Sequence, residues 1–489
     1  MADNFNTPAW VKDAIFYQIF PDRYARSARL PKPKNLEDWD TPPTVQGFKG
    51  GNLFGVVEKL DYLSDLGINA LYLNPIFQSA SNHRYHTHDY FRVDPLLGGE
   101  TAFEELVKES HRRGMRVILD GVFNHASRGF YQFNHILECG KDSPYLDWFD
   151  VTGFPLNAYN DDKPLHYRSW WGLRALPEFN FQNPQVREFI FGVARYWLEQ
   201  GIDGWRLDVP NCIDVPTFWQ EFRQTVKSTN LDAYIVGEIT TEAQDWLKGD
   251  KFDAVMNYQL TQACLGFFGG NKIDQGLAKG FMGLPPTSVL DAKAFSWRAD
   301  ELLNLYPREA SYSQLNILNS HDMPRFLDLV SGDKDRYRLA VLFQMTYPGA
   351  PCIYYGDEIG ITGGHTRKPE DARYAFPWEK PETWDSDLLK YYQGLIALRK
   401  KHPCLREGEF INLYAKDGIY AYLRYCFEEK LMVVINNQET SALLEIPVAG
   451  FFPDGAHLEA VWGKGVARVV EGRLTRFALE PHSGIVFSP

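Results

Sequence analysis

Short apolar runs that end in polar or charged residues recur along the chain, and each has the length of a buried β-strand. Between most of them lie stretches of helical length whose apolar residues have helical spacing, such as 100–114, 183–201 and 335–349. The pattern predicts a strand–helix unit that is repeated about eight times. The expected strands are AIFYQIFPDR (14–23), INALYLNPI (68–76), RVILDGVFNH (116–125), IDGWRLDV (202–209), AYIVGEI (233–239), FDAVMNY (252–258), QLNILNSHD (314–322) and PCIYYGDE (351–358).

Continuous apolar strands flanked by amphipathic helices indicate a parallel sheet that is covered on its outer face. Eight such units across roughly 400 residues predict a closed (β/α)8 barrel with insertions, because such a barrel takes about 250 residues and often more. The predicted fold class is therefore α/β, a TIM barrel. A doubly wound open sheet is the alternative.

Two changes of pattern divide the chain. After the third expected strand the sequence runs for about 55 residues, rich in Gly, Pro, Tyr and Trp, before helical periodicity resumes near Pro184. Near Cys404 it changes to short alternating segments, such as 418–427 and 430–437, that are typical of antiparallel strands. We therefore expect barrel at 1–122, an inserted subdomain B at 123–183, barrel again at 184–404 and a C-terminal antiparallel β-sandwich domain at 405–489.

Composition narrows the class of partner. The 489-residue chain has 44% hydrophobic and 23% charged residues, an ordinary globular composition, and a net charge of −12. This charge argues against nucleic acid as a partner, since nucleic-acid binding depends largely on Lys and Arg. Aromatic residues make up 15% of the chain and gather in expected loops such as 143–154 and 166–179. They offer stacking surfaces for sugar rings, and packing of these loops onto the core is the alternative.

The six cysteines show no closely spaced pair, so we expect them to be reduced. The N-terminal segment lacks a basic start followed by a long apolar run, and no apolar segment approaches the roughly 20 residues that span a bilayer. We therefore expect a soluble, cytoplasmic protein without a membrane partner.

Three carboxylates follow expected strands: Asp208, Glu238 and Asp322. Reactive groups of such barrels lie at the carboxyl ends of the strands, so these side chains should meet at one end of the barrel. Arg206 lies two residues before Asp208 on the same strand face and should hold that carboxylate ionised. Capping of a following helix is the alternative for any one of these acids, but three acids at successive strand ends favour a shared site.

This arrangement is the one that glycoside hydrolysis requires. Retaining enzymes use two carboxyl groups about 5 to 5.5 Å apart, one as a nucleophile and the other as a proton donor. Mutual repulsion and burial should raise the pKa of one member, and Glu238 is the best candidate for the proton carrier. Asp322 would then bind sugar hydroxyls and stabilise the positively charged transition state.

Histidines raise the question of a metal. His83, His86 and His88 lie close together in the sequence, but the helical H-x-x-x-H spacing and a matching carboxylate are missing, so no zinc site is expected. His125 ends the third expected strand. Taken alone, such a histidine is more often a structural residue than a ligand.

Four segments carry a family resemblance: DGVFNH (120–125), GWRLDV (204–209), VGEI (236–239) and NSHD (319–322). In order and spacing they resemble the four short signature regions of the α-amylase family of glycoside hydrolases. The resemblance covers nearly the whole chain and points to the neopullulanase and cyclomaltodextrinase subfamily, in particular to short members that debranch maltooligosaccharides. Further segments resemble that subfamily: FYQIFPDRY (16–24), LPEFN (176–180) and ARYAFPW (372–378).

The resemblance implies roles for particular residues. Asp208 is implied as the nucleophile, Glu238 as the general acid/base and Asp322 as the transition-state stabiliser. The positions implied to surround the sugar that is cleaved are His83, Tyr85, His125, Arg206 and His321, with Tyr85 stacked beneath it.

The sequence departs from the subfamily in two places that affect partners. Relatives commonly carry an N-terminal β domain that mediates dimerisation, whereas the first expected strand here begins near residue 14. We therefore expect a monomer, or a homodimer that does not use such a domain, with an open cleft that admits larger or branched glucans. Ile239, Thr240 and Thr241 stand where many relatives have Ile-Trp-His, so a stacking platform on the acceptor side is lost.

Calcium is left open by the resemblance. Asn124 matches a calcium ligand of many amylases, but the Asp/Asn-rich segment that binds calcium near the N-terminus of relatives is replaced by ARSARLPKPKN (25–35). We expect no organic cofactor and no required metal.

The sequence therefore predicts a retaining hydrolase of α-glucosidic bonds in maltooligosaccharides, cyclodextrins, pullulan or branched dextrins. A transglycosylase that uses the same covalent intermediate and a catalytically silent sugar-binding barrel are the alternatives. The complete carboxylate trio argues against the silent barrel, because a binding module gains little from mutually repelling acids. The choice between α-1,4 and α-1,6 bonds and the preferred chain or ring length stay open.

Overall fold

The computed structural model describes residues 6–279, 287–427, 429–475 and 477–489. Its largest part is a sheet of eight parallel strands in the order β8-β7-β6-β5-β2-β1-β10-β9. A parallel bridge between Met256 and Leu315 joins the β8 and β9 ends, so the sheet closes on itself. The ring confirms the predicted TIM barrel and excludes the open sheet. The barrel strands are β1 (Phe16–Ile19), β2 (Ala70–Leu73), β5 (Arg116–Gly121), β6 (Gly204–Leu207), β7 (Tyr234–Gly237), β8 (Ala254–Val255), β9 (Leu315–Ile317) and β10 (Ala350–Tyr354).

Side chains of the barrel strands alternate between the interior and the surrounding helices. In β6, Trp205 and Leu207 belong to the large core between strands and helices. Arg206 points the other way and reaches Met256, which belongs to the separate core inside the ring. Gly204 is needed where β6 and β7 approach each other, because an added Cβ would lie 2.3 Å from Tyr234 O. This alternation brings a charged residue of an apolar strand into the barrel.

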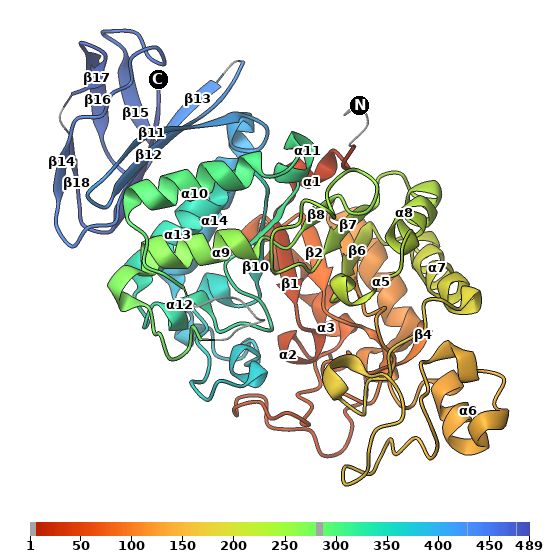
Figure 1. Ribbon diagram of the computed structural model, residues 1–489. Coiled ribbons are helices and arrows are strands. Elements are labelled where there is room, and N and C mark those ends of the chain that lie inside the picture. Colours follow the sequence, from red (N-terminus) through yellow and green to blue (C-terminus); the bar gives the residue numbers. More distant parts are fainter. Residues whose placement is uncertain (1–5, 280–286, 428, 476) are drawn as a thin grey trace.

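Helices surround the ring, and the C-terminus lies away from the inserted segment (Figure 1). Side-chain caps set several helix starts, for example Asn183, which accepts from Gln185 N ahead of a helix with Pro184 in its first turn. The helices are α1 (Trp10–Asp13), α2 (Pro21–Tyr24), α3 (Leu53–Glu58), α4 (Leu60–Leu66), α5 (Gly99–Arg112), α6 (Tyr131–Cys139), α7 (Pro184–Glu199), α8 (Phe218–Thr229), α9 (Tyr258–Cys264), α10 (Ala292–Asn304), α11 (Arg308–Ser311), α12 (Phe326–Leu329), α13 (Lys334–Thr346) and α14 (Ser386–Lys401).

Two excursions leave the strand–helix repeat at the carboxyl ends of the strands. After β2, the chain forms a hairpin of β3 (Phe77–Ser79) and β4 (Thr87–Val93), which the sequence pattern did not predict. Between β5 and α7 the chain forms α6, short 3-10 turns and isolated bridges such as His125 to Glu178. This inserted segment is mostly irregular, as its composition indicates.

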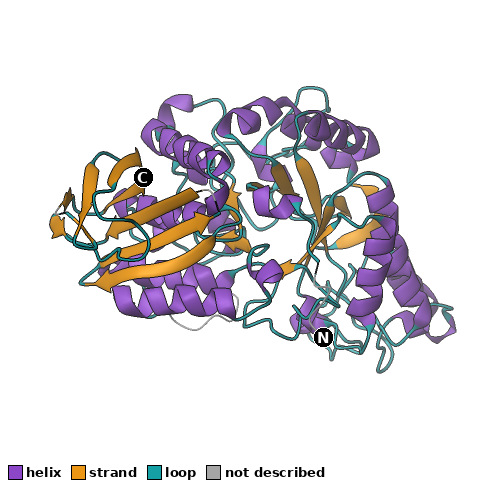
Figure 2. Cartoon of the chain, turned by 90° about the horizontal axis from the view of Figure 1, so that it is seen from above, coloured by secondary structure: helices purple, strands orange, loops and turns teal. Residues whose placement is uncertain are grey.

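The C-terminal part is antiparallel and packs against α10, α13 and α14 (Figures 1 and 2). Its larger sheet has the order β11-β12-β13-β19-β15-β16-β17, and β14 pairs with β18 in a second, small sheet. A separate apolar core lies within this part. Its strands are β11 (Glu409–Lys416), β12 (Ile419–Cys426), β13 (Glu429–Asn436), β14 (Ala442–Leu444), β15 (His457–Trp462), β16 (Val466–Val470), β17 (Arg473–Leu474), β18 (Phe477–Leu479) and β19 (Ser483–Ser488).

Within the described part of the chain, the helices are too short or too polar for any of them to cross a lipid bilayer.

Candidate active site

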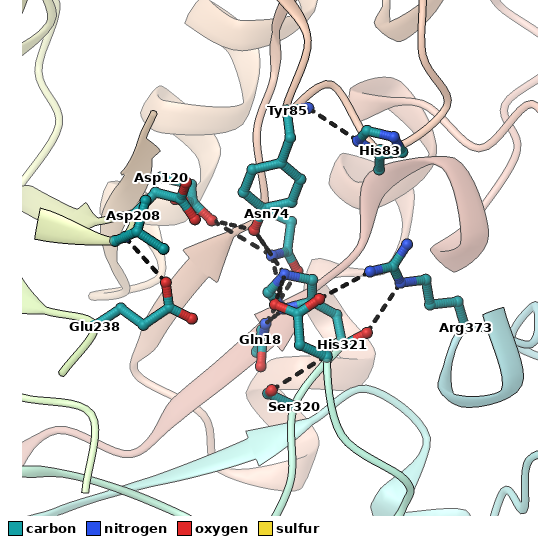
Figure 3. Close-up of polar contacts among 12 residues, drawn as sticks. Gln18, Asn74, His83, Tyr85, Asp120, Asp208, Glu238, Ser320, His321 and Arg373 are labelled. Carbon is teal, nitrogen blue, oxygen red and sulfur yellow. Dashed lines mark hydrogen bonds and ion pairs between the residues drawn. The ribbon is translucent and has the colours of Figure 1, made fainter. Parts of the chain in front are cut away.

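The three predicted carboxylates lie at the carboxyl ends of barrel strands. Asp208 follows β6 and Glu238 follows β7 (Figure 3). Asp322 lies in the loop after β9. All three line one pocket of about 590 Å³. The pocket wall also includes His83, Tyr85, His86, His125, Trp170, Trp171, Thr240 and Arg373. The barrel thus brings together residues that are far apart in the sequence.

One guanidinium joins two of these carboxylates. Arg206 Nη1 donates to Asp208 Oδ1 at 2.8 Å, and Arg206 Nη2 lies 2.6 Å from Glu238 Oε1. Nη1 also donates to Asp120 Oδ1 at 2.8 Å, so three acids share a single cation. All four side chains are buried. Asp208 and Glu238 are therefore held against different nitrogens of one planar group.

Burial governs the protonation of this pair. Burial raises the pKa of Asp208; Arg206 opposes this shift, and repulsion from Glu238 and Asp120 adds to it. Burial also raises the pKa of Glu238, with Arg206 opposing and Asp322 adding. The sequence predicted that Arg206 holds Asp208 ionised, but the guanidinium is divided among three carboxylates, and burial raises the pKa of Asp208 in spite of it. The pair titrates as a unit and retains a proton more readily than isolated carboxyl groups do.

Hydrogen bonds still distinguish the two carboxylates. Asp208 accepts a charge-assisted hydrogen bond from Arg206. The hydrogen bonds to Glu238 come from neutral donors, the Val209 N–H at 3.0 Å and the Tyr258 hydroxyl at 3.3 Å. Arg206 Nη2 also lies 2.6 Å from Glu238 Oε1, so the guanidinium stabilises a negative charge on either carboxylate.

The residue after Asp208 has a strained backbone. Val209 has φ 36° and ψ 49°, a left-handed conformation that β-branched residues rarely adopt. Such strain costs on the order of 1–3 kcal/mol and occurs where the surrounding structure imposes it. Here the turn directs the Val209 N–H toward Glu238 Oε2. The backbone next to Asp208 is thereby hydrogen-bonded to the Glu238 side chain.

Asp322 has a different environment. His321 Nε2 lies 2.8 Å from Asp322 Oδ2, and Arg373 Nη2 donates to Asp322 Oδ1 at 2.9 Å. Burial by itself would raise the pKa of Asp322, but His321 and Arg373 outweigh it and hold that pKa below its ordinary value. Asp322 is therefore the permanently charged member of the trio.

His321 is oriented by amide side chains from two neighbouring strands (Figure 3). Its Nδ1 accepts from Gln18 Nε2 at 2.9 Å and from Asn74 Nδ2 at 3.2 Å. An acceptor role for Nδ1 places a ring proton on Nε2. That nitrogen faces both Asp322 and the Tyr85 hydroxyl, which lies 2.6 Å away. The ring therefore links Tyr85 to the charged carboxylate.

The other predicted binding residues, His83 and His125, also line the pocket. Burial lowers the pKa of His125 to about 3, so its ring is neutral. Its buried Nε2 has no hydrogen-bond partner among the residues that the structure describes, and it is available to a sugar hydroxyl. His83 Nδ1 accepts the Tyr85 N–H at 3.1 Å, and burial lowers the pKa of this ring too.

Comparisons with known proteins agree with this geometry. Residues 18–382 match the model of the α-amylase catalytic domain, and residues 410–488 match that of the neopullulanase-like C-terminal domain. The chain belongs to the α-amylase family. It is therefore a glycoside hydrolase that cleaves α-glucosidic bonds with retention of configuration, as the sequence predicts.

Individual members of the α-amylase family resemble the chain over most of its length. A cyclomaltodextrinase from a Bacillus species is 44% identical over 446 residues, which are 90% of this chain and 76% of that protein. The native structure of the Nostoc punctiforme debranching enzyme has a TM-score of 0.91 at 44% identity and covers 99% of this chain and 100% of its own. The cyclic α-maltosyl-(1→6)-maltose hydrolase of Arthrobacter globiformis, in complex with that sugar, has a TM-score of 0.85 at 34% identity, with coverage of 99% and 100%.

Two residues of the site, Arg373 and Asp120, were not among the site residues predicted from the sequence. Arg373 contacts Asp322 and donates to His321 O at 2.9 Å, although its segment, ARYAFPW, was recognised as a family region. Asp120 also belongs to the site, since it accepts hydrogen bonds from Arg206, Tyr72 and Tyr85. The strand-end rule points to Asp120, because it precedes the end of β5, whereas no periodicity signals Arg373.

Metal ligands are not assembled in the described ranges of the chain: no group of three or more His, Cys, Asp or Glu side chains there could hold a metal ion. The rings of His83 and His86 lie edge to face with centroids 4.9 Å apart. Asn124, the position matched to a calcium ligand, lies beside His125, with Nδ2 3.4 Å from the ring Nδ1.

Proposed function

We propose that Asp208 is the nucleophile, Glu238 the general acid/base and Asp322 the transition-state stabiliser of this hydrolase. The observation that carries the assignment is the shared contact of Asp208 and Glu238 with the Arg206 guanidinium. It fixes two carboxyl groups side by side, as a retaining glycosidase requires. The fixed charge of Asp322 supports the third role, because a carboxylate stabilises a transition state that resembles an oxocarbenium ion.

The first step forms a covalent intermediate. The Asp208 carboxylate attacks the anomeric carbon from the face opposite the leaving oxygen, and the proton of Glu238 passes to that oxygen as the glycosidic bond breaks. The product of this step is a β-linked glycosyl ester of Asp208. In the second step Glu238 takes a proton from water, whose oxygen attacks the anomeric carbon and releases Asp208, so the α configuration is restored.

Residues around Asp322 would hold the sugar ring. Tyr85 presents an aromatic face in the pocket, and its hydroxyl is fixed by Asp120 and His321. The resemblance implies that this ring lies beneath the sugar that is cleaved, which supports the proposal. The unpartnered Nε2 of His125 supplies a further polar contact for a hydroxyl group. His321 is fully buried and would act on the sugar through Tyr85 and Asp322.

For the substrate we propose maltooligosaccharides that contain α-1,6 bonds, either as branches or within a ring. Similarity to proteins named as a debranching enzyme and as a cyclic α-maltosyl-(1→6)-maltose hydrolase, each covered over its whole length, supports this choice. The small, half-buried Thr240 in the pocket wall also supports it, because it leaves room on the acceptor side for a branched chain. Cyclodextrins are the second candidate, since the chain is also similar to cyclomaltodextrinase.

Transglycosylation is a separate candidate outcome of the same intermediate. Product analysis at high maltose concentration distinguishes it, because a sugar acceptor yields longer oligosaccharides whereas water yields only shorter ones. We further propose that the enzyme acts inside the cell, as the name of the 38% identical intracellular maltogenic amylase of Bacillus subtilis suggests.

The test of the mechanism is a trapped intermediate. A 2-fluoro-glucosyl fluoride should add one fluoroglucosyl group to the protein, and peptide mass analysis should locate it on Asp208. Asp208→Asn and Glu238→Gln should each lower turnover by about 10³-fold or more with the fold intact. A label on another residue, or near-normal turnover of either variant, would refute the roles assigned.

Substrate choice is tested separately. The wild-type enzyme should release linear oligosaccharides from a branched maltooligosaccharide and from pullulan faster than glucose units from soluble starch. Faster opening of β-cyclodextrin than of any branched substrate would favour the cyclodextrin candidate instead.

A further inference from the structure

A long loop between α2 and α3 reaches the wall of the catalytic pocket. Val45, near its tip, lines the pocket beside His83 and Tyr85. The Asn82 side-chain amide donates to three carbonyls of this loop, Thr44 O at 3.4 Å, Val45 O at 3.0 Å and Gly47 O at 2.7 Å. Since Asn82 directly precedes His83, the conformation of the loop and the position of the sugar-facing residues are coupled.

The Lys49 side chain lies inside this loop and donates hydrogen bonds to its oxygen atoms. Its side chain is fully buried, with 0% of its surface exposed. Nζ donates to Asp38 O, to Thr41 O at 2.7 Å and to Thr41 Oγ1 at 2.8 Å, and lies 3.5 Å from Glu37 Oε2. An ammonium group has three N–H donors, and here each has an oxygen acceptor. Burial lowers the pKa of Lys49, and the Glu37 carboxylate opposes that shift.

Further cations support the same loop. Arg26 donates to Lys49 O at 2.6 Å and to Glu37 O at 3.1 Å, and Arg23 Nη2 donates to Gly47 O at 3.0 Å. The backbone carbonyls that turn inward are therefore satisfied by basic side chains of this chain. Such convergence of oxygens on one positive centre is the usual task of a hard metal ion such as calcium.

The residues present do not fit calcium at this position. Calcium takes six to eight oxygen ligands, whereas the oxygens around Lys49 already surround a positive charge. The nearby Asp22 carboxylate is also engaged, since it accepts the Lys49 and Gly50 N–H groups and pairs with Arg23. This loop begins with 25–35, the segment that replaces the calcium-binding stretch of relatives.

We propose that the Lys49 ammonium takes the place of a structural cation: it fixes the loop at Glu37–Thr41 and, through Asn82, positions His83 and Tyr85 in the pocket wall. Lys49 is thus a positioning residue, and the enzyme has no calcium requirement at this loop. The link to substrate binding rests on the proposed function of the pocket, whereas the statement about calcium does not.

The matched control is Lys227 of α8. It is also largely buried, and its Nζ donates to Ala233 O at 2.7 Å and to Asp253 Oδ2 at 2.9 Å. These partners precede β7 and β8, so Lys227 lies at the amino ends of the strands, opposite the pocket. Loss of either ammonium should lower stability, but only loss of Lys49 should disturb the pocket wall.

The experiment compares wild type, Lys49→Met and Lys227→Met in excess EDTA and in millimolar calcium. Melting temperature and activity of the wild type should be equal in both. Lys49→Met should raise KM about tenfold with kcat changed much less, because charged hydrogen bonds that fix the wall are lost. Lys227→Met should lower the melting temperature and leave KM unchanged. If Lys49→Met does not fold, Thr41→Val removes one ammonium contact and should raise KM in the same direction by a smaller factor.

Two results would overturn the proposal. Loss of wild-type activity in EDTA with recovery in calcium would show that a metal holds the structure. Equal behaviour of the Lys49 and Lys227 variants, both less stable with normal KM, would show that Lys49 acts on stability alone. Failure of the proposed function is recognised separately, because Asp208→Asn and Glu238→Gln would then remain active.

Discussion

Tyr85 and His321, which are 236 residues apart in the sequence, lie with their ring planes 4° apart and are joined by a hydrogen bond of 2.6 Å. The loop after β9 thereby fixes the aromatic residue that follows β3. The same hydroxyl donates to Asp120 Oδ2 at 2.8 Å, so its position is defined from two sides of the barrel. The ring that would support the sugar is thus preorganised by polar contacts beneath it.

Replacing Tyr85 by Phe tests this preorganisation. Tyr85→Phe keeps the aromatic face but removes the hydrogen bonds to Asp120 and His321. We expect kcat/KM to fall about tenfold, the effect of losing roughly 1.4 kcal/mol of positioning. For Tyr85→Ala, kcat/KM should fall further than for Tyr85→Phe, because the stacking face is lost as well. Steady-state kinetics with a branched maltooligosaccharide measures both, and equal activity of Tyr85→Phe and wild type would show that the hydroxyl network is dispensable.

Loss of Arg373 should move the acidic limb of the pH profile to higher pH. His321 and Arg373 hold the pKa of Asp322 below its ordinary value. In Arg373→Gln that pKa should rise, so Asp322 becomes protonated at higher pH than in the wild type and activity is lost earlier on acidification. We also expect kcat/KM to fall about 30-fold or more at neutral pH, because a charge-assisted hydrogen bond is removed.

The control for this prediction is Arg367, which lines the same pocket but donates to Gly276 O rather than to a carboxylate of the trio. In Arg367→Gln the acidic limb of the pH profile should lie at the same pH as in the wild type. If the acidic limb of Arg373→Gln also lies at the wild-type pH, His321 alone fixes the charge of Asp322.

The sequence predicted those parts of the site that follow from periodicity. Seven of the eight barrel strands lie within one of the predicted apolar runs, and β10 begins one residue before its run, at Ala350. Asp208 and Glu238 follow the strands that were expected to carry them. The strand-end rule works because parallel strands deliver their last residues to one rim. Arg373 could not be predicted in this way, because it lies in an irregular loop whose path depends on tertiary contacts. The sequence also did not predict that Arg206 contacts three acids. These contacts depend on the pairing register between neighbouring strands, which cannot be read from the sequence of a single strand.

Trp171 is predicted to serve as a stacking platform in place of the one lost at Thr240. Its indole is 76% exposed, lines the pocket and stacks on Trp170 at 4.6 Å, and Trp170 in turn stacks on His125. Its φ of 50° is a conformation that large side chains rarely adopt. We expect Trp171→Gly to raise KM for oligosaccharides several-fold through loss of the aromatic face.

The same variant should not be less stable, because glycine tolerates positive φ and little buried surface is lost. Melting temperature and KM measured together separate the two effects. Trp297→Gly, which removes another exposed indole on α10, serves as the control for surface change and should leave KM unaltered. An unchanged KM in Trp171→Gly would show that the indole does not contact the substrate.

Glu358 should make the stability of the protein depend on pH. It follows β10, is fully buried and accepts hydrogen bonds from Tyr17 at 2.8 Å and Tyr62 at 2.7 Å. Burial raises its pKa from 4.5 to about 7, so the folded state binds this proton more tightly than the unfolded state does. The stabilising contribution is complete below about pH 4.5 and is lost as pH rises to about 7.

Glu358→Gln removes this titration while keeping the shape of the side chain. The free energy of unfolding of the variant, relative to wild type, should therefore increase by about 3 kcal/mol between pH 4.5 and pH 8. Chemical denaturation at both pH values gives this difference. Glu382→Gln, a change at an exposed glutamate, should show no comparable trend. The outcome that contradicts this prediction is a difference in unfolding free energy between Glu358→Gln and wild type that is the same at both pH values. Glu358 would then be ionised in the folded protein already at low pH, stabilised by its hydrogen bonds from two tyrosine hydroxyls.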